Sequence, residues 1–548
     1  MVCDLYDKIV ARSSSYLLPD EIQHHLRMNQ LNSNGSQLLS DLAASRLQKQ
    51  TRKQARVNEQ KVHVVGAGGT LTAAYEQLRN AAEYAEEHVL LQRAIRRFYR
   101  RLFVLHDKKR LRASGEELII ELTHAGYLPN DSVPEDDVAQ ISAAAVRYYE
   151  AYQALRKNKA ITYEQADKWT YELLAVEVEW RLNDNSQLQA FTQFAHSYFS
   201  STIDYEQVFG TPPPAVDISL YVAVHRALLK SDDAVLRLGL LARFGQSPNK
   251  LESYIDVNRQ IDEILLSQAT EKLFRMVDKR GAPLRVLRHM VDDSPDLAAL
   301  LPNREQMLLA YEKQVTSDYQ SVNRRVNNGI IKSVVFLIIT KFLIGIAIEI
   351  PYDYLMFDMI LWLPLIINLL LPPAYMVLLR ATMMLPGNAN TARLVKQIDT
   401  TLYAAEQPKQ LVRRAGQEFG TGYNVAYGVL FIAVFGGVAT LLWQVFDFDI
   451  MHLLIFFVFL SAASFLGFRL SRMIRELESV ETHQNGVTLV RDFLYMPFVV
   501  VGRFLSDKYS KVNVVALALD MLIELPLKTI LRLIRQWAAF ISAKKDQL

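Results

Sequence analysis

The sequence predicts an all-α fold, a polytopic helical membrane protein with four transmembrane helices in two hairpins and a large N-terminal helical cytoplasmic domain. Half of its 548 residues are hydrophobic, yet every long apolar run lies after about residue 328. Four of these runs reach the roughly 20 residues that a helix needs to cross a bilayer. Before them, apolar residues follow helical spacing and strand-like alternation is scarce.

Residues 1–69 are expected to form a mobile arm, because they are mostly polar and basic with few aromatic side chains. They contain no apolar signal segment, so we expect the first membrane helix to act as the insertion signal. The glycines at 66, 68 and 69 lack the spacing of a dinucleotide-binding fingerprint, and helical patterns follow them without further strands. A linker is the favoured interpretation.

Residues 70–328 are predicted to form the helical cytoplasmic domain. Stretches rich in Ala, Glu, Leu and Arg favour helices, and Gly126 followed by Pro129 is typical of a helix stop. Further helices are expected at 134–157, 161–200, 216–243, 249–277 and 303–328.

One helix of this domain is strongly basic on one face and carries apolar residues such as Ile95 and Phe98 on the other. Its basic residues are Arg93, Arg96, Arg97, Arg100 and Arg101. Such a helix can dock on anionic head groups, at about 1 kcal/mol per basic side chain near the surface. Docking on a membrane or a partner competes with a solvated face balanced by Glu83, Glu86 and Glu87. Nucleic acid is the least favoured partner.

The four apolar runs predict one hairpin at 329–380 and another at 424–470, joined by a cytoplasmic helical linker at 381–423. The predicted spans are Ile330–Ile350, Phe357–Leu379, Asn424–Phe446 and Met451–Leu470. Their connecting loops carry acidic residues without Lys or Arg, whereas the opposite flanks are rich in basic residues. The positive-inside rule therefore predicts that both termini are cytoplasmic.

Lys341 lies in the middle of the first span, where an unpaired charge costs at least about 2.5–3.5 kcal/mol. Counting 1.5 Å per residue places it at the depth of Asn368 in the second span. Pro372 and Pro373 deprive the carbonyls of Asn368 and Leu369 of helical hydrogen bonds. We hypothesise that Lys341 binds these acceptors and locks the hairpin.

Two alternatives stay open for this lysine. It can line a hydrated path together with Glu349 and Asp358, as intramembrane charges do in transporters. It can also snorkel to the interface. The candidate intramembrane polar cluster comprises Lys341, Asn368, Pro372, Pro373 and Glu349.

Small residues at similar depths predict close packing within the second hairpin, because small side chains let helices approach in lipid. They are Gly436, Gly437 and Ala439 in one span and Ser461, Ala462 and Ser464 in the other.

Residues 471–548 are predicted to form cytoplasmic or interfacial amphipathic helices. A charged stripe with one aromatic anchor suits a helix on the inner membrane surface. The alternative is a helix packed on the cytoplasmic domain. The residues concerned are Lys528, Arg532, Arg535 and Trp537.

Motifs for chemistry are scarce. The single cysteine, Cys3, excludes a disulfide framework, and the scattered histidines do not favour a metal site. The sequence contains no Walker-type phosphate loop, no GxSxG and no HExxH pattern. We therefore expect no enzyme, cofactor or metal.

The segments "KFLIGIAIEIPYD", "LWLPLIINLLLPPAYMVLL" and "LIELPLKTILRLIRQWAAFISAKK" resemble uncharacterised integral membrane proteins of reduced-genome bacteria. The resemblance covers about residues 330–548 and implies the bacterial cytoplasmic membrane, without any particular activity. With the predicted topology, we expect a membrane-anchored scaffold or assembly subunit that binds the lipid bilayer and other proteins or a second copy. The alternative is a transporter or channel component with a polar site around Lys341, Asn368 and Glu349.

Overall fold

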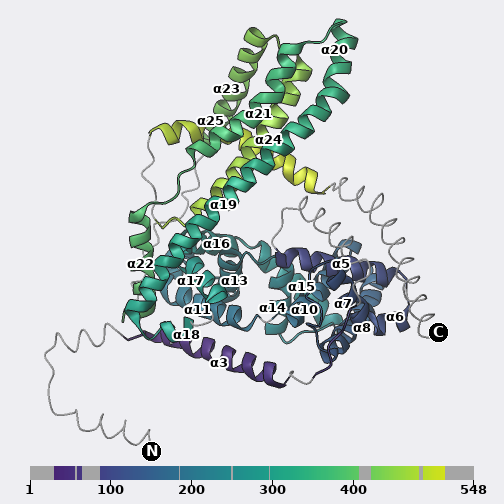
Figure 1. Ribbon diagram of the computed structural model, residues 1–548, viewed down its shortest axis with the longest axis vertical. Coiled ribbons are helices and arrows are strands. Elements are labelled where there is room, and N and C mark those ends of the chain that lie inside the picture. Colours follow the sequence, from purple (N-terminus) through teal and green to yellow (C-terminus); the bar gives the residue numbers. More distant parts are fainter. Residues whose placement is uncertain are drawn as a thin grey trace, which may run out of the picture. The chain divides into compact units, whose positions relative to one another are not determined.

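The computed structural model describes residues 30–55, 59–64, 87–105, 107–183, 185–248, 251–294, 297–405, 421–479 and 486–511. All regular elements in these ranges are helices (Figure 1), and β structure there is limited to isolated bridge residues, such as Lys61 paired with Pro134. The predicted all-α fold is confirmed. The chain divides into two compact units, which we call the helical unit and the membrane unit.

The helical unit is formed mainly by Arg46–Ser186 and Ala215–Phe274. Its helices before residue 186 are α5 (Glu87–Val104), α6 (Lys108–Arg112), α7 (Ser114–His124), α8 (Glu135–Lys157), α9 (Tyr163–Asp167), the π-helix η2 (Lys168–Glu172) and α10 (Leu173–Leu182). Those after residue 215 are α13 (Val216–Val224), the π-helix η3 (His225–Leu229), α14 (Asp233–Arg243), α15 (Leu251–Leu266) and the start of α16 (Gln268–Arg280).

The core of the helical unit surrounds α10, which packs on α5, α8 and α14. Trp169 in η2 is fully buried, and the Tyr254 hydroxyl donates a hydrogen bond to its carbonyl at 2.6 Å. The buried guanidinium of Arg237 donates to the Asn258 carbonyl at 3.1 Å and is paired with Asp262. Apolar packing and internal polar bonds therefore both hold α14 and α15 in this unit.

The membrane unit is formed by residues up to Ser45, Gln187–Pro214 and Arg275–Pro497. Outside the apolar spans it contains the first half of α3 (Ser33–Ala55), α11 (Ser186–Thr202), α12 (Tyr205–Phe209), α17 (Ala282–Asp293), α18 (Leu297–Leu300) and α22 (Asn388–Tyr403). The remaining elements are α19 (Arg304–Ile344), the π-helix η4 (Gly345–Glu349), α20 (Ile350–Phe357), α21 (Trp362–Thr382), α23 (Thr421–Phe446), α24 (Ile450–Arg475) and the first part of α25 (Gly486–Lys511).

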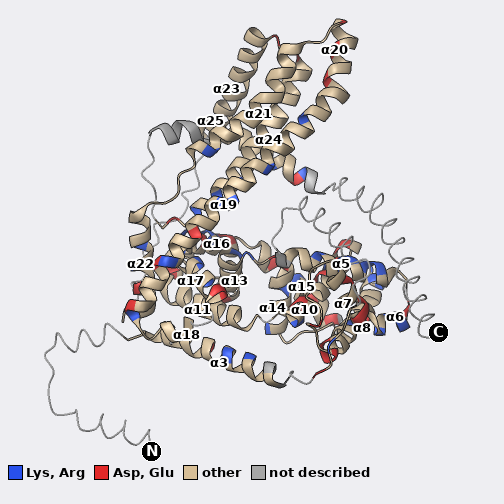
Figure 2. Ribbon diagram, in the orientation of Figure 1, with Lys and Arg blue, Asp and Glu red and all other residues tan. Residues whose placement is uncertain are grey.

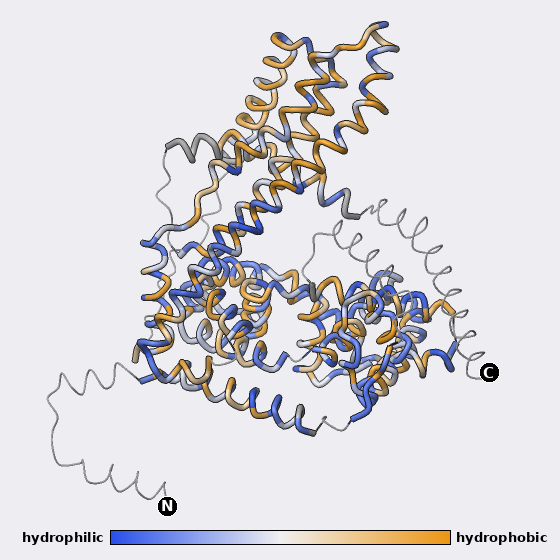
Figure 3. Tube along the Cα trace, viewed as in Figure 1, coloured by the Kyte–Doolittle hydropathy of each residue, from blue (hydrophilic) through white to orange (hydrophobic). Residues whose placement is uncertain are grey.

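Four helical segments of this unit are long and apolar enough to cross a membrane, which indicates a membrane-embedded protein. They are Arg304–Phe357, Trp362–Thr382, Val425–Phe446 and Ile450–Arg475. Figure 3 shows their hydrophobic character, and Figure 2 shows few charged residues along their apolar parts. The four predicted spans are thus confirmed as helices.

The first of these segments continues far beyond its apolar part. The 54 residues of α19, η4 and α20 form one uninterrupted rod, about 80 Å long at 1.5 Å per residue. The predicted domain boundary at residue 328 therefore falls inside a helix. The apolar end of this rod packs side by side with α21 and α24 in a three-helix bundle whose core includes Leu337, Met376 and Phe459 (Figure 1).

The predicted mobile arm is wrong for residues 33–55, which form α3. Leu38 and Leu42 are buried, and the backbone amide of Asn32 donates to the Leu402 carbonyl at 2.9 Å. The composition of this segment is polar, so the burial of Leu38 and Leu42 and the hydrogen bonds of Asn32 to the end of α22 hold it in place. Residues 1–29 of the predicted arm lie outside the described residues.

The predicted close packing of α23 on α24 is also wrong. A Cβ atom added at Gly436 or Gly437 would meet nothing within 4 Å, whereas one at Gly467 would meet Leu379 Cδ1 at 2.7 Å. Ser461 and Ser464 of α24 are buried, and Ser464 donates to the Tyr375 hydroxyl of α21 at 3.3 Å. The small residues of α24 therefore face α21.

Candidate functional site: a polar cluster between the membrane helices

An ion pair lies inside the three-helix bundle. The Lys341 ammonium is paired with Glu349 Oε1, and the two side chains are only 2% and 1% exposed. The ammonium also lies 5.1 Å from the centre of the Phe459 ring. The predicted partner of Lys341 is corrected, because the negative charge of Glu349 balances the ammonium, which the neutral acceptors around Asn368 do not.

The π-helix η4 explains how Glu349 reaches a lysine eight residues earlier on the same helix. Eight residues of regular α-helix would turn the carboxylate about 80° away from Lys341, at about 100° per residue. The extra residue of a π turn reduces this offset to about 20°. Single π turns are frequent at functional sites.

Asn368 of α21 joins the ion pair to the third helix of the bundle. Its amide nitrogen lies 3.5 Å from Glu349 Oε1 and donates to the backbone carbonyl of His452 in α24 at 3.3 Å. The cluster therefore links all three helices. In the structure Glu349 lies next to both Lys341 and Asn368.

Pro372 and Pro373 do not break α21, which continues as one helix from Trp362 to Thr382. Both prolines are buried on the face that also carries Asn368. Asp358, predicted for a hydrated path, is exposed at the end of α20, away from the ion pair. The prolines therefore contribute packing on the bundle side of α21.

Sequence reasoning missed a second polar pair. Asp353 of α20 and His452 of α24 are fully buried, with 3.3 Å between Asp353 Oδ1 and His452 Nε2. Next to it, the Tyr352 hydroxyl donates to Asp449 Oδ2. The signal was present, because Asp353 follows Glu349 by one helical turn and His452 follows Asp449 by three residues. It was overlooked because Asp353 and Asp449 fall in the loops between the predicted spans.

Several buried atoms of the three-helix bundle have no hydrogen-bond partner within the described part of the chain. They are Glu349 Oε2, Asn368 Oδ1, Asp353 Oδ1, both ring nitrogens of His452, and Ser461 Oγ. Buried polar atoms are normally bonded, so this set marks the bundle as a candidate functional site.

At the opposite end of α24, a buried arginine connects the helix to α17. Arg285 donates to the carbonyl of Glu476, the residue that ends α24, at 2.9 Å. The same guanidinium donates to the carbonyl of Asp278 at 3.0 Å and is paired with its carboxylate. Arg472 of α24 lies 3.6 Å from the same carboxylate but is half exposed.

Two further links connect α22 to these helices. Asn390 donates to the Leu477 carbonyl and to the Tyr319 hydroxyl, both at 2.8 Å. Arg304 donates to both carboxylate oxygens of Asp399, at 2.7 and 2.8 Å. The helices outside the spans are thus bonded to the membrane helices within one unit.

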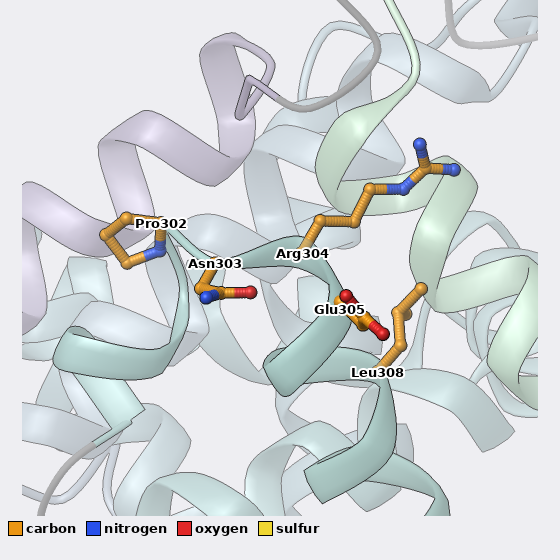
Figure 4. Close-up of a pocket in the computed structure, with 5 residues that line it drawn as sticks. All are labelled: Pro302, Asn303, Arg304, Glu305 and Leu308. Carbon is orange, nitrogen blue, oxygen red and sulfur yellow. The ribbon is translucent and has the colours of Figure 1, made fainter. Parts of the chain in front are cut away.

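A hollow of about 520 Å³ lies where α19 begins (Figure 4). It is lined by Pro302, Asn303, Arg304, Glu305 and Leu308. Arg304 is held by Asp399, and the Asn303 side chain accepts from the Gln306 amide at 3.2 Å to cap the helix. These two polar side chains therefore serve the start of α19.

The predicted basic helix is α5, and acidic residues of the same unit neutralise much of its charge. Arg96 pairs with Glu172 at 3.1 Å, Arg100 with Asp167 at 3.1 Å, and Arg101 with Glu121 at 2.6 Å. Burial raises the pKa of Glu172, whereas Arg96 lowers it. Arg93 and Arg97 are partly buried on the same helix.

The predicted counter-charges Glu83 and Glu86 lie outside the residues whose structure is described, and the acids that pair with α5 come from other helices. The predicted interfacial residues also lie outside them; these are Lys528, Arg532, Arg535 and Trp537. Among the described residues, no three His, Cys, Asp or Glu side chains are grouped to hold a metal ion.

No family model matches the chain, and the search of curated proteins and of solved structures finds no match either.

Proposed function

We propose that the chain is a membrane-anchored scaffold or assembly subunit, which presents its helices outside the bilayer to other proteins. The observation that carries this proposal is the Lys341–Glu349 pair together with Asn368, which links α19, α21 and α24. A charge pair that is neutral and enclosed by protein can specify one helix packing.

The same helix that carries the pair also extends outside the bilayer. The rod of α19, η4 and α20 begins at Arg304, where Asp399 of α22 holds it, and Arg285 ties α17 to the end of α24. A partner bound to these helices would be held rigidly relative to the bundle. Rigid mounting is the property that a scaffold requires.

We further propose that the protein lies in the bacterial cytoplasmic membrane with both termini in the cytoplasm. The basic flanks and the acidic hairpin loops support this orientation. In a background with Cys3→Ser, single cysteines at Asp358 and Asp447 test it, since both positions are exposed. They should react with an impermeant thiol reagent in intact cells, and a cysteine at the exposed Asn388 should not. The reverse labelling would overturn the topology.

The scaffold is tested by purifying the full chain from its native membrane in mild detergent. We expect another protein in a fixed ratio, retained when Lys341 and Glu349 are replaced together by Met and Gln, because the variant chain keeps its outer surface. A chain that purifies alone under conditions that preserve membrane complexes contradicts the proposal.

The second candidate is a transporter or channel component. It is favoured by the buried Glu349 Oε2 and Asn368 Oδ1, two acceptors of the polar cluster that have no hydrogen-bond partner within the described chain. Reconstitution in liposomes tests it. Solute or ion flux that Lys341→Met abolishes would favour transport, whereas the scaffold predicts no flux in either chain.

We propose that the basic residues flanking the membrane helices bind anionic lipid head groups. Vesicles with and without anionic lipid test this for the full chain. Higher thermal stability in the anionic vesicles, which falls as salt is added, is the expected result.

A further inference from the structure

The Lys341–Glu349 pair and Asn368 already link the three helices, so this link does not explain why Asp353 and His452 are buried together. Asp353 Oδ2 accepts a hydrogen bond from the Leu361 amide at 3.0 Å, which leaves Oδ1 facing His452 Nε2 at 3.3 Å. Neither Oδ1 nor either ring nitrogen has a hydrogen-bond partner in the described chain. Both side chains are fully buried, so water outside the bundle does not solvate them.

The neighbouring charges decide which protonation state this pair can hold. The titratable or charged groups around it are Lys341 of α19, Glu349 of η4, Tyr352 of α20 and Asp449 next to α24, whereas α21 contributes the neutral Asn368. Lys341 and Glu349 neutralise each other.

An ionised Asp353 beside a neutral His452 would therefore leave one uncompensated negative charge inside the bundle. A charge that is fully buried without a counter-charge is costly. Glu349 lies one helical turn from Asp353, and like charges at this spacing repel each other. One added proton removes the excess charge, whether it resides on the imidazole or on the carboxylate.

We propose that Asp353 and His452 form an intramembrane proton-binding site that keeps one proton at neutral pH. The proton is shared between His452 and Asp353, whose Nε2 and Oδ1 atoms lie 3.3 Å apart. The ligand is a proton delivered by water. This proposal does not depend on the scaffold function, since a scaffold or a transporter can hold such a site.

The site communicates with the solution at the hairpin-loop end of the bundle. Tyr352 precedes Asp353 directly, and its hydroxyl donates to Asp449, which is partly exposed. In the other direction, beyond the Lys341 pair, Leu337 and Phe459 form an apolar core. Proton exchange is therefore expected from the loop side.

Counting protons on unfolding tests the site. The full chain in nonionic micelles is unfolded with urea in a weakly buffered solution at about pH 8, where free Asp and His side chains are deprotonated. The wild type should release about one proton per chain more than Asp353→Asn, whose native pair is neutral without an added proton. The matched control is Asp447→Asn, an exposed acid at the same end, which should behave like the wild type.

Equal proton release from the wild type and Asp353→Asn would overturn the proposal. If Asp353→Asn fails to fold, nitrogen NMR of the histidine-labelled wild type decides, with His452 assigned by the signal lost in His452→Gln. A charged imidazole at about pH 8, or a neutral ring whose Nε2 carries no hydrogen and accepts a hydrogen bond, supports the site. A neutral ring whose Nε2 carries the hydrogen overturns it, because Asp353 then has no added proton to share.

Discussion

Glu349 lies on the same face of its helix as Lys341, although eight residues separate them, because the π turn of η4 adds one residue between them. Lys341 sits in the middle of the first membrane span, and the pair is enclosed by α21 and α24. Its stability therefore depends on both charges being present.

Replacing Lys341 by Met should destabilise the bundle by about 3–5 kcal/mol, because Glu349 is left as an unpaired buried carboxylate. The double variant with Glu349→Gln should recover most of this loss. Unfolding in detergent, arranged as a double-mutant cycle, measures the coupling. Additive effects of the two substitutions would contradict an ion pair inside the bundle.

Replacing Arg285 by Gln should destabilise the membrane unit by about 1.5–3 kcal/mol, because buried hydrogen bonds from a charged donor are lost. Arg472→Gln is the matched control, since Arg472 contacts the same carboxylate of Asp278 but is half exposed. It should cost at most about 1 kcal/mol. Thermal unfolding of both variants side by side gives the comparison, and equal losses would contradict the role of the Glu476 carbonyl.

Gly467→Leu should disturb the packing of α24 on α21, since even a Cβ atom there would meet Leu379 Cδ1 at 2.7 Å. Overpacking of this kind costs about 1–3 kcal/mol. Gly436→Leu places the same side chain in open space on α23 and should be tolerated. Melting temperatures in one detergent check both. A larger loss of stability in Gly436→Leu than in Gly467→Leu would instead support the predicted close packing of α23 on α24.

The buried phenol of Tyr254 should ionise at high pH only when the helical unit unfolds. Burial raises the pKa of its phenol, so the neutral form is favoured in the folded state. The stabilisation of the folded state that this pKa difference provides is complete below the ordinary tyrosine pKa of about 10. It is lost as the pH rises toward the raised pKa. In a base titration followed by tyrosinate absorbance, Tyr254 should ionise only as the unit unfolds.

Tyr254→Phe provides the control for this titration. It removes the hydrogen bond to the Trp169 carbonyl and should cost about 0.5–1.5 kcal/mol at neutral pH. The absorbance step at unfolding should be smaller by one tyrosinate. An unchanged step would show that Tyr254 ionises earlier, in the folded state.

Several elements agree with the sequence-based predictions because their causes are local. The helix predicted at 134–157 is Glu135–Lys157, and the fourth span predicted at Met451–Leu470 is Ile450–Arg475. In contrast, α17 and the helical part of the predicted arm were not anticipated. The polar composition of the arm is ambiguous, and α17 is a short helix with charged and apolar residues. The burial of side chains such as Leu38 and Leu284 decides both structures.

The candidate site was predictable only in part. Counting residues along two spans placed Lys341 near Asn368, because helix rise is constant. The same count placed Asp353 in a loop, since hydropathy does not reveal that α20 continues the helix and buries this side chain.

The amino-acid sequence by itself determined the all-α class and the four membrane helices, because helix propensity and hydropathy are properties of short segments. Only the tertiary structure decided that Glu349 neutralises Lys341, that His452 faces Asp353, and that α24 packs on α21. These relationships depend on which helices meet and on a single π turn. Long-range packing sets both, and no short segment encodes them.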